Sequence, residues 1–258
     1  MDFIALSLRL TLMMVAGMLV CLEIGYRVGL RRSSRQNESE KSGISIIDAS
    51  IFGLLGLILA FTFGGVVSRL DHRRQLIVEE ANAIETAYLR LSILASPAGD
   101  ALRVQLKDYL DSRIGAYALL PDTKAALVEL ARGNRMQKEI WENAVEAAKM
   151  ASPQPVAVLL LPALNQMFDV ATKRTRAAFS HVPMPIIYLL MATAWFCSIL
   201  AGYSLYNPKG RNILHMLIFA AMISVTFYAI LDLEYPRLGL INLRDADQVL
   251  INLRASFN

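Results

Sequence analysis

The chain has 258 residues, of which 55% are hydrophobic, a formal net charge of +4 and a mean hydropathy of +0.42. Soluble domains usually contain about 45–50% apolar residues, and the excess here lies in four long blocks, which indicates an integral membrane protein. The pI of about 9.1 does not indicate nucleic-acid binding, because the cations flank the apolar blocks, as they do beside lipid headgroups. Cys21 and Cys197 are too far apart in sequence for a C-x-x-C redox pair and too few for a zinc cluster.

The first apolar block runs from Phe3 to Ile24. A cleaved signal peptide is the alternative, but the chain does not begin with a basic segment, and Glu23 and then arginines follow the apolar core. We therefore expect a retained membrane helix, with Arg9 reaching toward water near one end. The polar segment from Ser33 to Gly43 has no apolar period and is expected to be a loop or a disordered linker.

The second block, Ala49 to Val67, has no charged residue and is long enough to cross a hydrocarbon core of about 30 Å. It is rich in glycine, which permits close helix contact. If this span lines a pore, Leu57 and Phe61, one helical turn apart, would form a hydrophobic constriction that gates by dewetting. Packing in the bundle or contact with lipid is the alternative for each of these side chains.

The third and fourth blocks, Val182 to Tyr206 and Ile213 to Leu231, are joined by a turn at Asn207–Gly210. Between the second and third blocks, helical periodicity predicts a helix from Arg69 to about Ala95, continuous with the second span. Prolines then delimit further helices. Their expected ranges are Pro97–Leu119, Thr123–Met150 and Val156–His181, the last kinked or delayed at Pro162, with an amphipathic stretch at Asp245–Phe257.

These elements predict an all-α protein, with a four-helix transmembrane domain and a helical extramembrane domain inserted between spans two and three. The expected divisions are 1–68 for spans one and two, 69–181 for the helical domain, 182–233 for spans three and four, and 234–258 for the tail. With four spans, both termini and the helical domain lie on one side of the membrane. The short loops carry many arginines and lysines, which favours a cytoplasmic position for those loops and a periplasmic one for the helical domain.

A polar stripe follows the second span. At about 100° per residue, Glu79, Asn82, Thr86 and Arg90 fall on one face of the expected helix, and apolar residues occupy the opposite face. An ordinary solvated face is the simple interpretation. In a symmetric oligomer, the same stripe from each subunit would instead line a vestibule and bias the entry of ions.

No motif of an enzyme, a nucleotide site or a metal site is present, and no cofactor is expected. Asp232 and Glu234 close the fourth span near Arg237, where they would form a cation pair, anchor a loop or coordinate an ion. The three histidines, His72, His181 and His215, lie near membrane boundaries and are expected to have interfacial or packing roles.

The order of these features resembles the bestrophin-like family of bacterial membrane proteins. The resemblance rests on the Val78–Ile84 segment with Glu80-Ala81-Asn82, on Tyr88-Leu89-Arg90, and on the tail motif Asp232, Glu234, Pro236 and Gly239. It implies a distant similarity to bestrophins, which are pentameric anion channels with a cytosolic helical domain. Bestrophins have large apolar side chains at three successive turns of a narrow neck, and the corresponding positions here are Leu57, Phe61 and Gly65, so the third is missing.

The leading hypothesis is therefore a homo-oligomeric ion channel of the inner membrane, conducting anions, with the second span lining the pore. The expected partners are membrane lipids, inorganic ions and further copies of the chain, pentameric by analogy, with no nucleic acid. The alternative is a non-conducting membrane module whose helical domain senses a signal or binds a partner. A membrane enzyme has no support from residue spacing.

Overall fold

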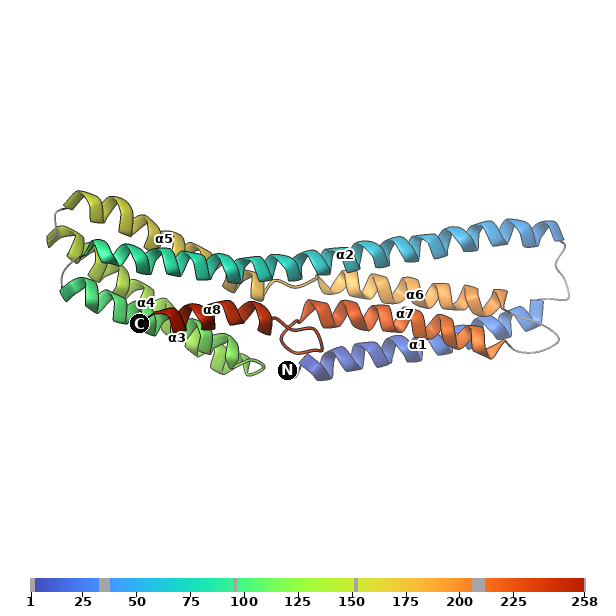
Figure 1. The fold of residues 1–258 in the computed structure, drawn as a ribbon. Helices are drawn as coiled ribbons and strands as arrows, with labels where there is room; N and C mark the ends of the chain where they lie inside the picture. The colour runs from blue at the N-terminus through green and yellow to red at the C-terminus, as the bar shows by residue number, and fades with distance from the viewer. Residues whose placement is uncertain (1–2, 33–37, 95–96, 151–152, 206–211, 258) are drawn as a thin grey trace. The chain divides into compact units, whose positions relative to one another are not determined.

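The computed structural model describes residues 3–32, 38–94, 97–150, 153–205 and 212–257, and every regular element among them is a helix (Figure 1). The chain divides into two compact units. We call Met1–Ser68 with His181–Tyr235 the membrane unit, and Arg69–Ser180 with Pro236–Asn258 the extramembrane unit. The predicted all-α class is confirmed.

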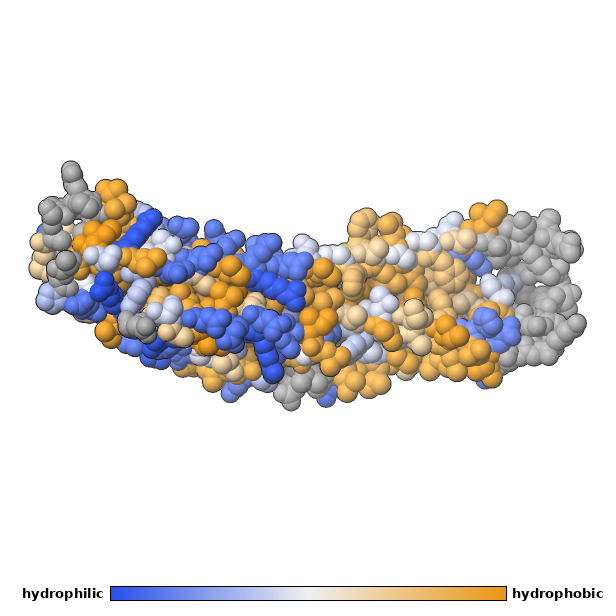
Figure 2. All heavy atoms as spheres, viewed as in Figure 1, coloured by the Kyte–Doolittle hydropathy of each residue, from blue (hydrophilic) through white to orange (hydrophobic). Residues whose placement is uncertain are grey.

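The membrane unit contains helices long and apolar enough to cross a membrane, and on its visible face hydrophobic residues predominate (Figure 2). In the described residues there are four such helices, as predicted: α1 (Phe3–Arg32), α2 (Glu38–Arg90), α6 (Met184–Ser204) and α7 (Ile213–Glu234). Helix α1 continues beyond Ile24, where the first block was expected to end. An ion pair of 2.7 Å between Glu23 Oε1 and Arg27 Nε, one turn apart, supports this basic extension.

Glycines allow α1 and α6 to pack with their backbones in contact. A Cβ atom at Gly202 would collide with the carbonyl group of Leu22, and one at Gly25 would collide with the carbonyl group of Ile199. Close approach through small residues is the usual way in which helices associate in lipid, where apolar side chains gain nothing by leaving the solvent.

Helix α2 is longer than any single predicted element. It begins at Glu38, so the end of the expected polar linker is helical, and it runs unbroken to Arg90 before a 3₁₀ turn, η2 (Leu91–Ile93). The prediction that the second span continues into the following helix is confirmed. Residues 33–37 and the expected turn at Asn207–Gly210 lie outside the described residues.

The extramembrane unit combines the last part of α2 with four further helices. These are α3 (Pro97–Ala118), α4 (Thr123–Met150), α5 (Pro153–Ala178) and α8 (Arg244–Ser256). Helix α4 begins where Asp122 accepts hydrogen bonds from the backbone N–H groups of Lys124 and Ala125, at 3.0 and 3.1 Å. Helix α5 starts before Pro162 and passes through it, so the expected delay does not occur.

The apolar face that periodicity predicted for α2 is buried in the core of the extramembrane unit. Its buried residues include Leu76, Ile77, Ile84 and Ala87, and Leu91, which begins η2, is buried as well. Helix α8 is fixed at its end by two contacts. Arg254 donates to Asp111 on α3 at 2.7 and 3.0 Å, and Phe257 stacks on Tyr88 with ring centres 3.8 Å apart.

Candidate functional site

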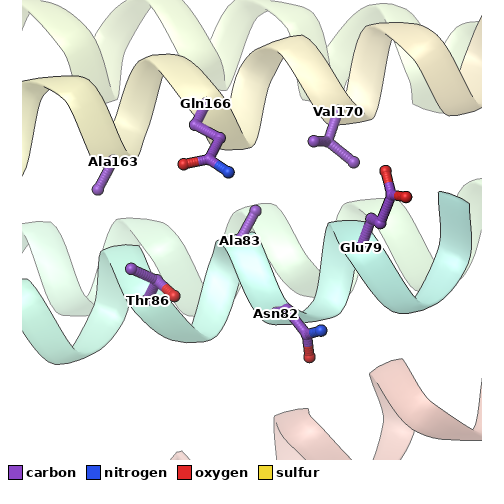
Figure 3. Close-up of a pocket in the computed structure, with 7 residues that line it drawn as sticks. All are labelled: Glu79, Asn82, Ala83, Thr86, Ala163, Gln166 and Val170. Carbon is purple, nitrogen blue, oxygen red and sulfur yellow. The ribbon is translucent and has the colours of Figure 1, made fainter.

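The polar stripe on α2 lines a groove in the extramembrane unit. Glu79, Asn82 and Thr86 line this groove from α2 and Gln166 lines it from α5, around a cavity of about 270 Å³ (Figure 3). Glu79 points toward α5, and Gln166 points back toward α2. The Glu79 carboxylate and the Gln166 amide thus point into the groove, whereas the Asn82 amide points away from α5. Carboxylate and amide oxygens can replace part of the hydration shell of an ion.

Arg90, the fourth residue of the predicted stripe, has a different role. Its guanidinium donates to the backbone carbonyl of Leu159 at 2.7 Å and thereby ties the end of α2 to the early part of α5. Arg90 is absent from the lining of the groove. The stripe thus separates into three lining residues and one residue that holds two helices together.

The membrane-spanning part of α2 exposes the predicted constriction residues. Leu57 is 52% exposed and Phe61 is 74% exposed, and Gly65 is half-buried. On the same segment, a Cβ atom added at Gly53, Gly56 or Gly64 would meet nothing within 4 Å among the described residues. A single chain therefore leaves much of this span uncovered, so lipid, another copy of the chain or a pore must face it.

The extramembrane unit also contains a buried ion-pair network, which the periodicity did not predict. The Glu80 side chain has no exposed surface, and its two oxygens accept from Arg113 Nε at 2.6 Å and Arg174 at 2.5 Å. Burial disfavours the charged form of Glu80, but the attraction of both arginines and their hydrogen bonds outweigh it, so its pKa is lowered. Burial likewise opposes the charge on Arg113, yet Glu80 raises its pKa above the usual value.

The network continues around the aromatic ring of Tyr117. The guanidinium carbons of Arg113, Arg174 and Arg237, which we call the arginine cluster, lie 5.4, 3.9 and 4.8 Å from the centre of this ring. Asp247 on α8 accepts from Arg174 at 2.9 Å and from Arg237 at 2.6 and 2.9 Å. Three cations around one aromatic ring are thus held by two carboxylates.

The tail motif is divided between the two units. In the membrane unit Asp232 and Glu234 are buried, and Glu234 Oε1 accepts from the backbone N–H of Val182 at 3.0 Å and lies 3.4 Å from His181 Nδ1. This geometry favours loop anchoring, one of the roles expected for Glu234. In the extramembrane unit, Pro236 is buried, and Pro236 and Gly239 line an open cavity.

The Arg237 cation, expected near Asp232 and Glu234, forms an ion pair with Asp247. Among the residues that the structure describes, no three His, Cys, Asp or Glu side chains are grouped closely enough to hold a metal ion. The contacts of Glu234 therefore fit the loop-anchoring role expected for the tail motif.

Comparison with known proteins identifies relatives of the whole fold. The sequence profile of the bestrophin-like domain matches residues 15–247. A mutant of a bacterial bestrophin homologue from Klebsiella pneumoniae superposes with a TM-score of 0.65 at 16% identity, covering 94% of this chain and 99% of that one. A second mutant of that homologue gives 0.62 at 18% identity, covering 96% and 99%. A structure described only as a membrane protein gives 0.60 at 15% identity, covering 95% and 99%. No curated protein sequence is significantly similar to this chain.

Proposed function

This chain belongs to the bestrophin-like family, and from that premise we propose that it is an oligomeric ion channel in which α2 lines the pore. The family and the similar bacterial structures support a membrane channel fold. The observation that carries the pore assignment is the uncovered span of α2. A pore-lining helix must present one face to the axis of an oligomer, and α2 leaves Leu57 and Phe61 exposed in the single chain.

The exposed residues suggest a short hydrophobic gate. Leu57 and Phe61 are one turn apart, so in a ring of subunits each would form one apolar ring around the axis. Gly65, one turn further on, has no side chain to extend the constriction. A narrow apolar segment loses its water easily and then blocks ions, and it conducts when it widens or becomes wet.

The gate is tested by planar-bilayer recording of purified protein carrying Phe61→Ala. We expect single-channel conductance or open probability to rise severalfold, because the narrow apolar ring becomes wider and holds water more readily. Phe196→Ala is the matched control, since Phe196 is 66% exposed on α6 but does not belong to α2. Equal effects of the two substitutions would contradict pore lining by α2, and absence of current from the wild-type protein would contradict conduction.

Subunit number and ion preference follow the family in this proposal: a pentamer that conducts anions. Imaging of single detergent-solubilised particles tests the first by their symmetry, and reversal potentials under a chloride gradient test the second. A ring with α2 facing its axis supports the channel. A monomer or a two-fold dimer without an axial pathway supports the alternative, a non-conducting module that senses a signal or binds a partner.

The orientation in this proposal also follows the family and places the extramembrane unit in the cytoplasm. The count of basic residues in the short loops predicts the opposite orientation. Val128 on α4 is 69% exposed and offers a labelling position. In intact cells, Val128→Cys is expected to react with a membrane-impermeant maleimide only after the membrane is permeabilised. Labelling of intact cells through this cysteine would reverse the orientation.

A further inference from the structure

An open cavity of about 470 Å³ lies in the extramembrane unit, apart from the polar groove and from the span of α2. The end of α3, one position on α5 and the segment from Pro236 into α8 surround it. Charged, polar and apolar side chains line this cavity, and the polar ones include the Asp247 carboxylate and the amides of Asn242 and Gln248. Arg174, Arg237 and Arg244 supply guanidinium groups, and residues such as Leu120 and Ile251 supply apolar surface.

The arginines at this cavity are not fully neutralised. Among the lining residues, Arg174, Arg237 and Arg244 carry three positive charges and Asp247 carries one negative charge, which leaves an excess of two. The buried pair of Arg113 and Glu80 adds no net charge to this count. The Arg244 side chain is exposed and forms no ion pair with any other residue in the described part of the chain. Like charges held this close repel one another, so an anion in the cavity would stabilise the arrangement.

We propose that this cavity binds an organic phosphate monoester, with its phosphate at Arg244 and Arg237 and its organic body on the apolar wall. A phosphate monoester carries about −1.5 to −2 charges at pH 7, which matches the excess of two, whereas a carboxylate neutralises only one. The planar fork of arginine suits phosphate oxygens. The volume is that of a small-molecule site, about 300–1,000 Å³, and is larger than inorganic phosphate needs.

A phosphate monoester has two sources, a soluble metabolite or a lipid headgroup such as that of phosphatidic acid. Calorimetry on the full-length protein in detergent separates them with two probes, phenyl phosphate and short-chain phosphatidic acid. Inorganic phosphate and benzoate are the comparison ligands. We expect saturable binding of phenyl phosphate that is tighter than that of either comparison ligand. Tighter binding of phosphatidic acid than of phenyl phosphate assigns the site to a lipid, and the reverse assigns it to a soluble ligand.

Two substitutions test the location. Arg244→Ala removes an unpaired exposed cation and is expected to weaken phenyl phosphate binding at least about tenfold. Arg135→Ala is the control, because Arg135 is an exposed arginine on α4 and does not line the cavity. Ile251→Glu, at a position that is 44% exposed, adds a negative charge to the apolar wall and is also expected to weaken binding.

Several results would overturn this assignment. These are the absence of saturable binding of both phosphate probes to the wild-type protein, equal affinity for benzoate or inorganic phosphate, and equal weakening by Arg244→Ala and Arg135→Ala. The readout is binding alone, so the assignment stands or falls independently of whether the protein conducts ions.

Discussion

Glu80 is an ionised and fully buried carboxylate, and its charge holds arginines from two other helices. Its partners Arg113 on α3 and Arg174 on α5 are nearly as buried as Glu80 itself. Glu80→Gln would leave both arginines without their counter-charge in a site of low polarity. We expect a loss of about 3–5 kcal/mol in the free energy of unfolding, measured as a lower thermal midpoint of the detergent-solubilised protein. Glu142→Gln, at an exposed position on α4, makes the same charge change and should have little effect.

The same carboxylate should make stability depend on pH in the acid range. Because the pKa of Glu80 is lowered in the folded state, its contribution to stability is present above its unfolded value of 4.5 and is lost as pH falls through the folded value. At pH values below 4.5, we therefore expect the thermal midpoint of the wild-type protein to decrease more steeply with falling pH than that of Glu80→Gln. Parallel pH profiles of the two proteins would show that Glu80 does not carry this dependence.

Sequence periodicity could predict the faces of α2 but not this network. It assigned Glu79, Asn82 and Thr86 to the polar stripe, and the structure brings these three together at the groove. Glu80 lies among the buried residues of the opposite face, and a charge in an apolar stripe was the available signal. Its partners are 33 and 94 residues away in sequence, and no local pattern specifies which distant arginine reaches a given carboxylate.

The positions of the helices could be predicted from the sequence more readily than the residues at which they end. Prolines and a capping aspartate delimit α3 and α4, so their starts could be predicted from local chemistry. The polar residues at the start of α2 have no apolar period, so composition alone predicted a linker where the helix already begins at Glu38. The contact of α1 with α6 depends on which glycines face each other, and this requires the tertiary fold.

At the level of elements, substitutions at two glycines distinguish helix packing within a single chain from contacts between chains. Gly202→Leu forces a side chain into the backbone of α1, and we expect a loss of folded protein, since overpacking costs about 1–3 kcal/mol or more. Gly56→Leu meets open space in the single chain and should leave the fold intact. If α2 contacts neighbouring subunits, however, Gly56→Leu should lower the oligomer fraction. Size-exclusion chromatography with light scattering measures both outcomes, and unchanged oligomers in Gly56→Leu would contradict close subunit contact at this glycine.

For the whole molecule, α2 is the element that supplies residues to both units, the exposed Leu57 and Phe61 in one and the polar groove in the other. One helix therefore carries both the proposed gate and the polar stripe that was expected to bias the entry of ions. In an oligomer every subunit would contribute one copy of Glu79, and a ring of carboxylates repels anions and attracts cations. Glu79 therefore acts against the anion preference proposed from the family. Removing its charge should change ion selectivity in a known direction if ions pass the groove.

Glu79→Gln should raise the ratio of anion to cation permeability, because it removes one negative charge per subunit while keeping the shape and the polarity of the groove. Under a potassium chloride gradient, the reversal potential should move toward the equilibrium potential of chloride. The shift should be larger in dilute salt, since the Debye length is about 30 Å at 0.01 M and about 10 Å at 0.1 M. Glu85→Gln is the matched control, because Glu85 is exposed on the same helix but does not line the groove. Equal shifts for the two variants would mean that α2 influences permeation only through its overall charge, and that the groove lies outside the path of the ions.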